Sequence, residues 1–194
     1  MKKTILIFVA FMFCHTGCQR VEIEKIQNHT QLTASIEQFA GHTKTYLEDL
    51  NVFWEHDDCI AVFDNSTAKS CYRINRDAVG STSGLFDSVS LPEEGTGDLM
   101  DGCIAYYPYS PLVSCEQSEK GFILSGLQMP GLQTFKENTI AQNHLPMAAQ
   151  SDNLDNLSFR NICGIIKIQL LGEGTITSVT VSGNSDEVLS GEMQ

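Results

Sequence analysis

The chain has 194 residues, 42% of them hydrophobic and 19% charged, which is enough for one domain with its own apolar core. Its formal net charge is −12, and an acidic surface repels phosphate backbones, so nucleic-acid binding is disfavoured. The cysteines after residue 18 are widely spaced and show no CxxC pattern, which argues against a zinc site. We expect them to be small buried hydrophobes, with room for one or two disulfides in an oxidising compartment.

The first 18 residues have the layout of a secretory signal. Lys2 and Lys3 form a positive start, 5–13 is an apolar run, and Gly17 precedes Cys18. A helix needs about 20 apolar residues to cross a bilayer, so this run is too short to be a membrane span. The sequence therefore predicts export and removal of the leader.

Thr16-Gly17-Cys18 also resembles the end of a lipoprotein signal, in which the cysteine is lipidated and becomes the new N-terminus. Acylated Cys18 would anchor the chain to a membrane surface through residues 19–29, which we interpret as a tether. The alternative is a plain secretory cut near Gly17. With Lys2 and Lys3 gone, the formal charge becomes 10 − 24 = −14.

From residue 30 onward the hydrophobic period is two. Leu32, Ala34 and Ile36 alternate with polar residues, which predicts a half-buried strand. Further predicted strands are 51–54, 59–63, 70–74, 85–89, 103–107, 121–127, 161–171 and 175–182, with turn residues between them. About seven to nine short strands favour an all-β sandwich, and 129–156 is either a surface excursion or a crossover between sheets.

The most hydrophobic predicted strand is GIIKIQLL, residues 164–171. Its apolar residues suggest a central strand covered on both faces. TITSVTVSG, residues 175–183, follows after GEG, so the two runs are expected to form an antiparallel hairpin. Because the chain ends soon afterwards, we expect a partner or a second domain to complete the fold.

CIAYYPYSP, residues 103–111, begins as a strand that Pro108 ends by removing a ladder donor. A sugar could stack on the aromatic rings of this chain, provided that at least two rings are accessible; the candidates are Trp54, Tyr106, Tyr107 and Tyr109. Tyr106 and Tyr107 are better explained as parts of the sheet with hydroxyls near water. Trp54 and Tyr109 are the candidate contact aromatics.

Three short motifs suggest chemistry, and in each case a structural interpretation is preferred. STAK (66–69) and SDN (151–153) match two motifs of serine β-lactamases, but STAK lies between strand-like runs and no KTG follows. EHDD (55–58) could hold a hard cation, but a polar turn between two strands explains it better. We predict no catalytic residue, metal or cofactor.

Taken together, these motifs resemble the fimbrillin-like (Mfa-type) family of Bacteroides-type pilus subunits and surface lipoproteins. The residues that carry the resemblance are Cys18, LTASIEQ, TKTYLEDLNVFWEHDDCIAVFD, GLFDSV, IAYYPYS and the stretch from LSFRNICG to SGEM. The likeness covers roughly residues 30–193. It implies that 30–194 is an N-terminal domain with an antiparallel, Greek-key, transthyretin-like β-sandwich, normally followed by a second domain that this sequence lacks.

The resemblance also implies a non-enzymatic function at the cell surface, in pilus assembly or adhesion. In pilus-forming members a protease removes the first strand and a strand of the next subunit replaces it, an example of β-augmentation. Leu32, Ala34 and Ile36 would belong to that removable strand, although no arginine lies between Arg20 and Arg73 to mark a cut. Expected partners are other pilus subunits, the outer membrane through the lipid anchor, and a host protein or glycan. The alternative function is a carbohydrate-binding surface lipoprotein.

Overall fold

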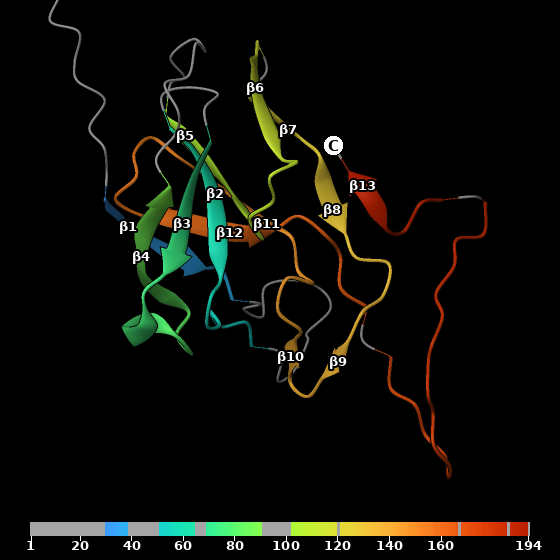
Figure 1. The fold of residues 1–194 in the computed structure, drawn as a ribbon. Helices are drawn as coiled ribbons and strands as arrows, with labels where there is room; N and C mark the ends of the chain where they lie inside the picture. Colours follow the sequence, from blue (N-terminus) through green and yellow to red (C-terminus); the bar gives the residue numbers. More distant parts are fainter. Residues whose placement is uncertain are drawn as a thin grey trace, which may run out of the picture.

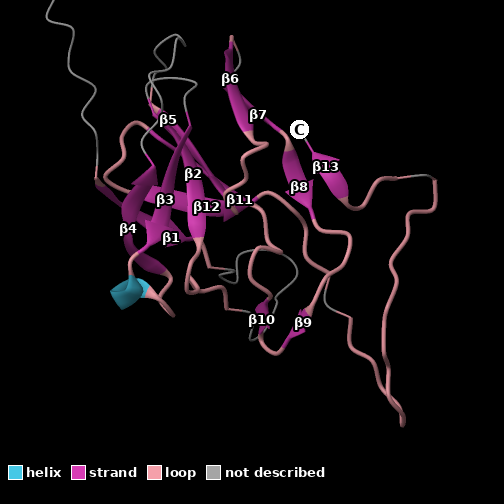
Figure 2. Ribbon diagram, in the orientation of Figure 1, coloured by secondary structure: helices cyan, strands magenta, loops and turns pink. Residues whose placement is uncertain are grey.

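A computed structural model describes residues 30–38, 51–64, 69–90, 102–119, 121–166, 168–185 and 187–193. The predicted leader, the lipidation site Cys18 and the 19–29 tether lie outside these residues. Within them, the chain is built from strands and one short 3-10 helix, η1 (Arg76–Ala78) (Figures 1 and 2). This confirms the predicted all-β class. No helix among the described residues is long and apolar enough to cross a membrane.

Seven strands form one closed sheet. Going round it, the order is β1 (Gln31–Ile36), β12 (Leu157–Asn161), β11 (Met147–Ser151), β5 (Cys103–Tyr107), β2 (Cys59–Asp64), β3 (Lys69–Ile74) and β4 (Ser83–Ser90), which pairs again with β1. Every neighbouring pair is antiparallel except β1 with β12, which is parallel. The sheet pairing is thus a closed barrel, whereas a sandwich of two separate sheets was expected. Closure occurs because β1 pairs along both of its edges.

Three two-stranded sheets lie outside the barrel. They pair β6 (Ser114–Ser118) with β7 (Gly121–Ser125), β8 (Leu127–Met129) with β13 (Gly191–Met193), and β9 (Phe135–Lys136) with β10 (Thr139–Ile140). Figure 1 shows β6, β7 and β8 in succession along one side of the barrel. Residues 129–156, expected to be either a surface excursion or a crossover between sheets, contain β9, β10 and β11, and β11 joins the barrel beside β5.

The apolar residues form two clusters. The main one fills the barrel and centres on Trp54, with Phe86, Tyr107 and Phe159 against its ring. The second lies on the other face of β2 and β5, where Phe63 and Tyr106 and their neighbours pack against Val113, Cys115 and Leu127 from the β6–β8 region. Because both faces of β5 are covered, all five of its residues are buried.

Most predicted strands before residue 110 are confirmed within a few residues: 32–36 is β1, 59–63 is β2, 70–74 is β3, 85–89 is β4 and 103–107 is β5. The predicted strand 51–54 belongs to no ladder, although it places Trp54 in the core. The predicted strand 121–127 is divided at Gly126 into β7 and β8.

The predicted hairpin of 161–171 and 175–182 is wrong for this structure. The strand here is β12, which ends at Asn161, and the described residues between it and β13 pair with no strand. Most of their apolar side chains are exposed, for example 75% at Ile166 and 89% at Leu171, while Ile165 packs against the main core cluster. A two-stranded hairpin is marginal in water unless a further strand or a covered face supports it, and the closed barrel offers these runs no free edge.

Candidate functional site: the first strand and its place in the barrel

β1 lies between β4 and β12 and closes the barrel (Figure 1). It runs antiparallel to β4, where Leu32 is opposite Phe86, and parallel to β12, where Ile36 is opposite Phe159. Leu32 pairs only with β4 and Ile36 only with β12, whereas Ala34 between them pairs on both sides, with Gly84 and with Leu157. Without β1, both β4 and β12 would have an edge of unpaired backbone donors and acceptors.

The predicted alternation along β1 is confirmed by its burial. Leu32, Ala34 and Ile36 are 3%, 0% and 5% exposed and belong to the main core cluster. The residues between them, Thr33 and Ser35, are only half-buried. β1 therefore supplies three apolar side chains to the barrel interior, and the middle one is small.

Backbone hydrogen bonds extend the pairing beyond both ends of β1. Ser88 N donates to Thr30 O over 2.9 Å, and Glu37 N donates to Phe159 O over 2.9 Å. One side-chain bond reinforces the first end, from Gln31 Nε2 to Asp87 Oδ1 at 2.8 Å. The strand is thus held chiefly by main-chain pairing and by alternate apolar side chains, both of which another strand of similar pattern could supply.

Trp54 is not an exposed contact residue, contrary to expectation. It is 1% exposed, and its ring makes edge contacts with Phe86, Tyr107 and Phe159 at centroid distances of 4.9, 5.5 and 5.6 Å. A large aromatic side chain gains most by filling the barrel interior, so no ring face remains for a ligand.

The tyrosines of CIAYYPYSP are divided between the two clusters. Tyr106 and Tyr107 are 1% and 5% exposed. The expectation that their hydroxyls lie near water is wrong for Tyr107, whose hydroxyl donates to the buried Asp58. Tyr109 is half-buried against the second cluster, with the Lys69 amine 5.5 Å from its ring centroid. Of the four proposed stacking rings, only Tyr109 is partly accessible, whereas a glycan platform needs two.

EHDD forms the predicted polar turn. Asp57 has a φ of 66°, and Asp58 N donates to Glu55 O over 3.2 Å, which closes the turn before β2. His56 and Asp57 are exposed and lie 2.7 Å apart through Nδ1 and Oδ2. Among the described residues, no group of three or more histidines, cysteines and carboxylates is placed to hold a metal ion.

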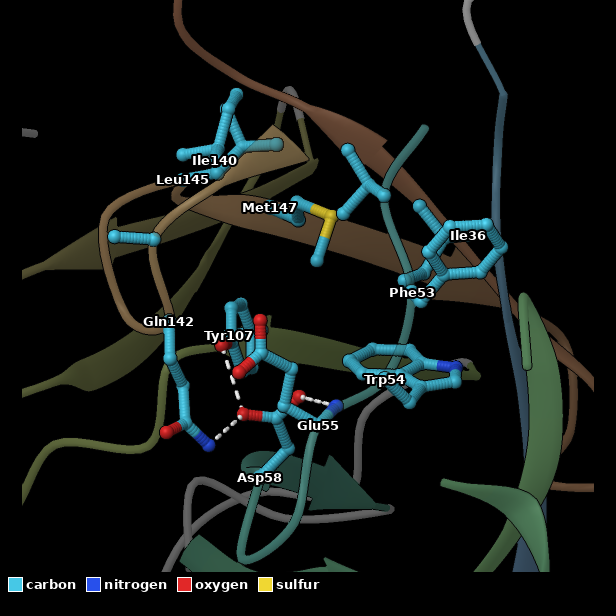
Figure 3. A pocket seen from close by; sticks show the side chains of 12 residues that line it. Ile36, Phe53, Trp54, Glu55, Asp58, Tyr107, Ile140, Gln142, Leu145 and Met147 are labelled. Atoms are coloured by element: carbon cyan, nitrogen blue, oxygen red, sulfur yellow. Dashed lines mark hydrogen bonds between the residues drawn. The ribbon is translucent and has the colours of Figure 1, made fainter. Parts of the chain in front are cut away.

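The last residue of that motif, Asp58, is the centre of a buried polar network (Figure 3). Its Oδ1 accepts hydrogen bonds from Tyr107 Oη at 2.9 Å and Gln142 Nε2 at 2.8 Å, and its Oδ2 accepts one from Glu55 N at 2.7 Å. The carboxyl group is 2% exposed, and this desolvation raises the pKa of Asp58 in spite of the three donors. Desolvation likewise raises the pKa of Tyr107.

Sequence reasoning missed this network because its members are 49 and 84 residues apart. The single available signal was a run of carboxylates directly before an apolar strand, which places one of them at the edge of the core. The cavity beside Asp58 has a volume of about 20 Å³, much too small for an organic ligand.

A larger surface hollow of about 410 Å³ lies near the end of β3. Charges of both signs line it, among them Arg73, Arg76, Asp57 and Asp87, and its lining contains no Trp, Tyr or Phe. It therefore lacks the stacking faces that the carbohydrate-binding alternative requires.

STAK does not present a free lysine. The Lys69 amine donates to Ser110 O, Pro111 O and Val113 O over 2.9, 2.7 and 2.9 Å. Partial burial lowers the pKa of Lys69, while three carbonyl acceptors favour the ammonium form. Lys69 thus ties the 110–113 loop to β3, a role that the sequence did not reveal. Ser66 lies outside the described residues.

Comparison with family models, curated proteins and solved structures finds no match. The functional interpretation of the chain therefore depends on its own residues and geometry, together with the resemblance of its motifs.

Proposed function

We propose that this chain is a lipid-anchored, fimbrial-type cell-surface protein that acts in pilus assembly or adhesion by β-strand complementation. In this proposal residues 30–194 are a fimbrillin-like N-terminal domain related to transthyretin-like sandwiches. The observation that supports it is the position of β1, which pairs on both edges and buries Leu32, Ala34 and Ile36 in the main core.

Strand replacement is physically reasonable at this position. β1 is short, lies nearest the N-terminus of the described barrel, and is held mainly by interactions that any strand with alternate apolar residues can make. Loss of β1 alone would leave two unpaired edges and an apolar groove between β4 and β12. Such a groove strongly favours a new strand because both main-chain pairing and apolar burial are recovered together.

The anchor in this proposal is acylated Cys18, which places the protein on the outer membrane with 19–29 as its tether. Its partners are other subunits that exchange strands with it, and its activity is binding without catalysis.

Strand exchange can be tested with a cut but otherwise complete chain. A protease recognition sequence is inserted between residues 39 and 50, which lie outside the described residues, and the folded protein is cleaved there. We expect a labelled peptide of residues 30–38 in excess to replace the original strand. A matched peptide with Leu32→Asp and Ile36→Asp keeps the length but loses the apolar pattern, so it should not enter. A cleaved protein that stays folded and takes up neither peptide, or both equally, contradicts the proposal.

The anchor has a separate test. Mass spectrometry of the N-terminus of membrane-extracted protein should find an acylated Cys18. An unmodified N-terminus near Gly17 would support the plain secretory alternative and remove the anchor, while the strand-exchange result would stand by itself.

A further inference from the structure

Two of the five described cysteines lie on the same face of the β2–β3 pair. Cys59 is opposite Arg73 in the register and Ala61 is opposite Cys71, so Cys59 and Cys71 occupy diagonal positions. Side chains on one face at diagonal positions are within reach of each other. Register alone therefore places two thiols from neighbouring strands side by side.

Cys59 has Cys71 and Arg73 of β3 as its side-chain neighbours. After desolvation, the neighbouring Cys59 sulfur contributes to the raised pKa of Cys71, and it is the main cause of the raised pKa of Arg73. The Cys59 thiol also lies 3.4 Å from Asp57 O, to which it donates.

The two thiols differ in access. Cys59 is half-buried at the start of β2, next to the exposed turn, whereas Cys71 is 8% exposed. Desolvation raises the pKa of Cys71 to about 11. The arrangement thus contains one thiol that a reagent can reach, and one sheltered thiol at the diagonal position on the same face. The accessible thiol is the one that a reagent reaches first, whereas the sheltered Cys71, kept largely protonated by its raised pKa, is left to react with the sulfur next to it.

We propose that Cys59 and Cys71 form a redox-active pair that a low-molecular-weight disulfide converts into a disulfide linking β2 to β3. The Cys59 thiolate attacks one sulfur of the reagent, forms a mixed disulfide and releases one reagent thiolate. The Cys71 thiolate then attacks the Cys59 sulfur and releases the second. Two protein thiols lose two electrons and two protons in total, and the reagent becomes two thiols.

The bond has a structural consequence. Diagonal residues have Cα atoms about 7–8 Å apart, with Cβ atoms somewhat closer, while a disulfide needs Cβ atoms about 3.5–4.5 Å apart. Oxidation therefore draws β2 and β3 together beside the EHDD turn, and a bond formed under such tension is readily reduced again. The inference is independent of strand replacement, because it involves neither β1 nor its neighbours β4 and β12.

The test equilibrates the folded full chain with mixtures of reduced and oxidised glutathione, blocks free thiols and maps tryptic peptides. Trypsin releases Cys59 within 45–69 and Cys71 within 70–73, each with no second cysteine, so the linkage is unambiguous. We expect the linked pair 45–69 with 70–73 under oxidising mixtures and its loss under reducing ones. If both cysteines stay fully blocked after oxidation, or either is linked to another cysteine, the proposal fails.

Single substitutions distinguish a redox pair from two packed thiols. In Cys71→Ser the resolving thiol is gone, so Cys59 should accumulate one bound glutathione. In Cys59→Ser the sheltered Cys71 should stay free. Cys115→Ser, which changes a buried cysteine of the second cluster, should leave the 59–71 linkage as in the parent. Equal glutathione addition to both single variants, or none to Cys71→Ser, would overturn the assigned roles.

Discussion

The barrel and the chain that follows it use similar apolar residues in different ways. Ile60, Val62 and Phe159 in the barrel strands are 0% exposed, whereas Ile168 and Val181 in the 162–190 segment are 50% and 54% exposed. Figure 1 shows this segment, in orange to red, leaving the barrel and returning to place β13 beside β8. Both regions alternate apolar and polar residues, but only one of them is a sheet.

The difference lies in the availability of pairing partners. Each barrel strand has a neighbour on both sides, so backbone pairing and side-chain burial are gained together. The 162–190 segment follows a sheet that is already closed, and alternation without a partner edge does not make a strand stable. Burial in this chain is therefore decided by topology more than by local hydrophobicity.

The largest effect should come from the barrel centre. Trp54→Ala removes a ring that contacts three aromatic neighbours, and large-to-small core substitutions of this kind cost about 3–5 kcal/mol. Denaturant unfolding should show this loss of unfolding free energy. Trp54→Phe, which keeps an aromatic ring in the cavity, should cost clearly less. Equal losses in both variants would mean that the indole does not fill the core as described.

β1 provides a matched pair of substitutions on adjacent residues. Ala34→Asp puts a carboxylate at a position with 0% exposure and should cost about 3 kcal/mol or more. Ser35→Asp places the same group on the half-buried outer face and should cost less than about 1 kcal/mol. Thermal unfolding of the two variants checks the difference, and similar losses would show that β1 is not seated with Ala34 inward.

The same pairing logic explains which strands could be predicted. β1 to β5 have β-branched or aromatic residues in alternation or in short apolar runs, so local pattern and tertiary role agree. β11, MAAQS, has no β-branched or aromatic residue and is a strand because β5 and β12 lie on either side of it. The 164–171 run has the opposite combination: its local pattern is strong, but its described residues have no partner strand, so the sequence pattern predicts a strand that the structure lacks.

For the site, the sequence predicted which side of β1 faces inward but not where Trp54 lies. Inward-facing positions follow from a period of two within one strand, which is a local property. The burial of Trp54, the three donors to Asp58 and the carbonyls around Lys69 depend on residues brought together by the closed sheet. No local spacing encodes them.

Asp58 gives the third prediction, which concerns pH. Burial raises its folded-state pKa above the ordinary value of 3.8, so its neutral form is favoured in the fold. The contribution of Asp58 to stability is therefore fully present below that value and is lost as the pH rises through the folded-state pKa. Asp58→Asn removes this titration, and its amide cannot accept from both Glu55 N and the two Oδ1 donors. We expect a loss of about 1–3 kcal/mol.

The pH profile separates titration from simple loss of hydrogen bonds. The difference in unfolding free energy between parent and Asp58→Asn should be largest at acidic pH and decrease as the pH rises. A constant difference between pH 3 and pH 8 would show that Asp58 does not titrate with the raised pKa. Asp57→Asn, on the exposed neighbour, is the matched control.

The smallest effect should come from the 162–190 segment. Val179 and Val181 are 53% and 54% exposed, and replacing both with threonine keeps the branched shape while removing apolar surface that already faces water. We expect less than about 0.5 kcal/mol in urea unfolding. Val62→Thr, the same exchange at a barrel position with 0% exposure, should cost several times more because it buries a hydroxyl. A loss above about 1 kcal/mol for the double variant would show that these valines pack against a partner strand in solution, and the contrast between barrel and segment would then disappear.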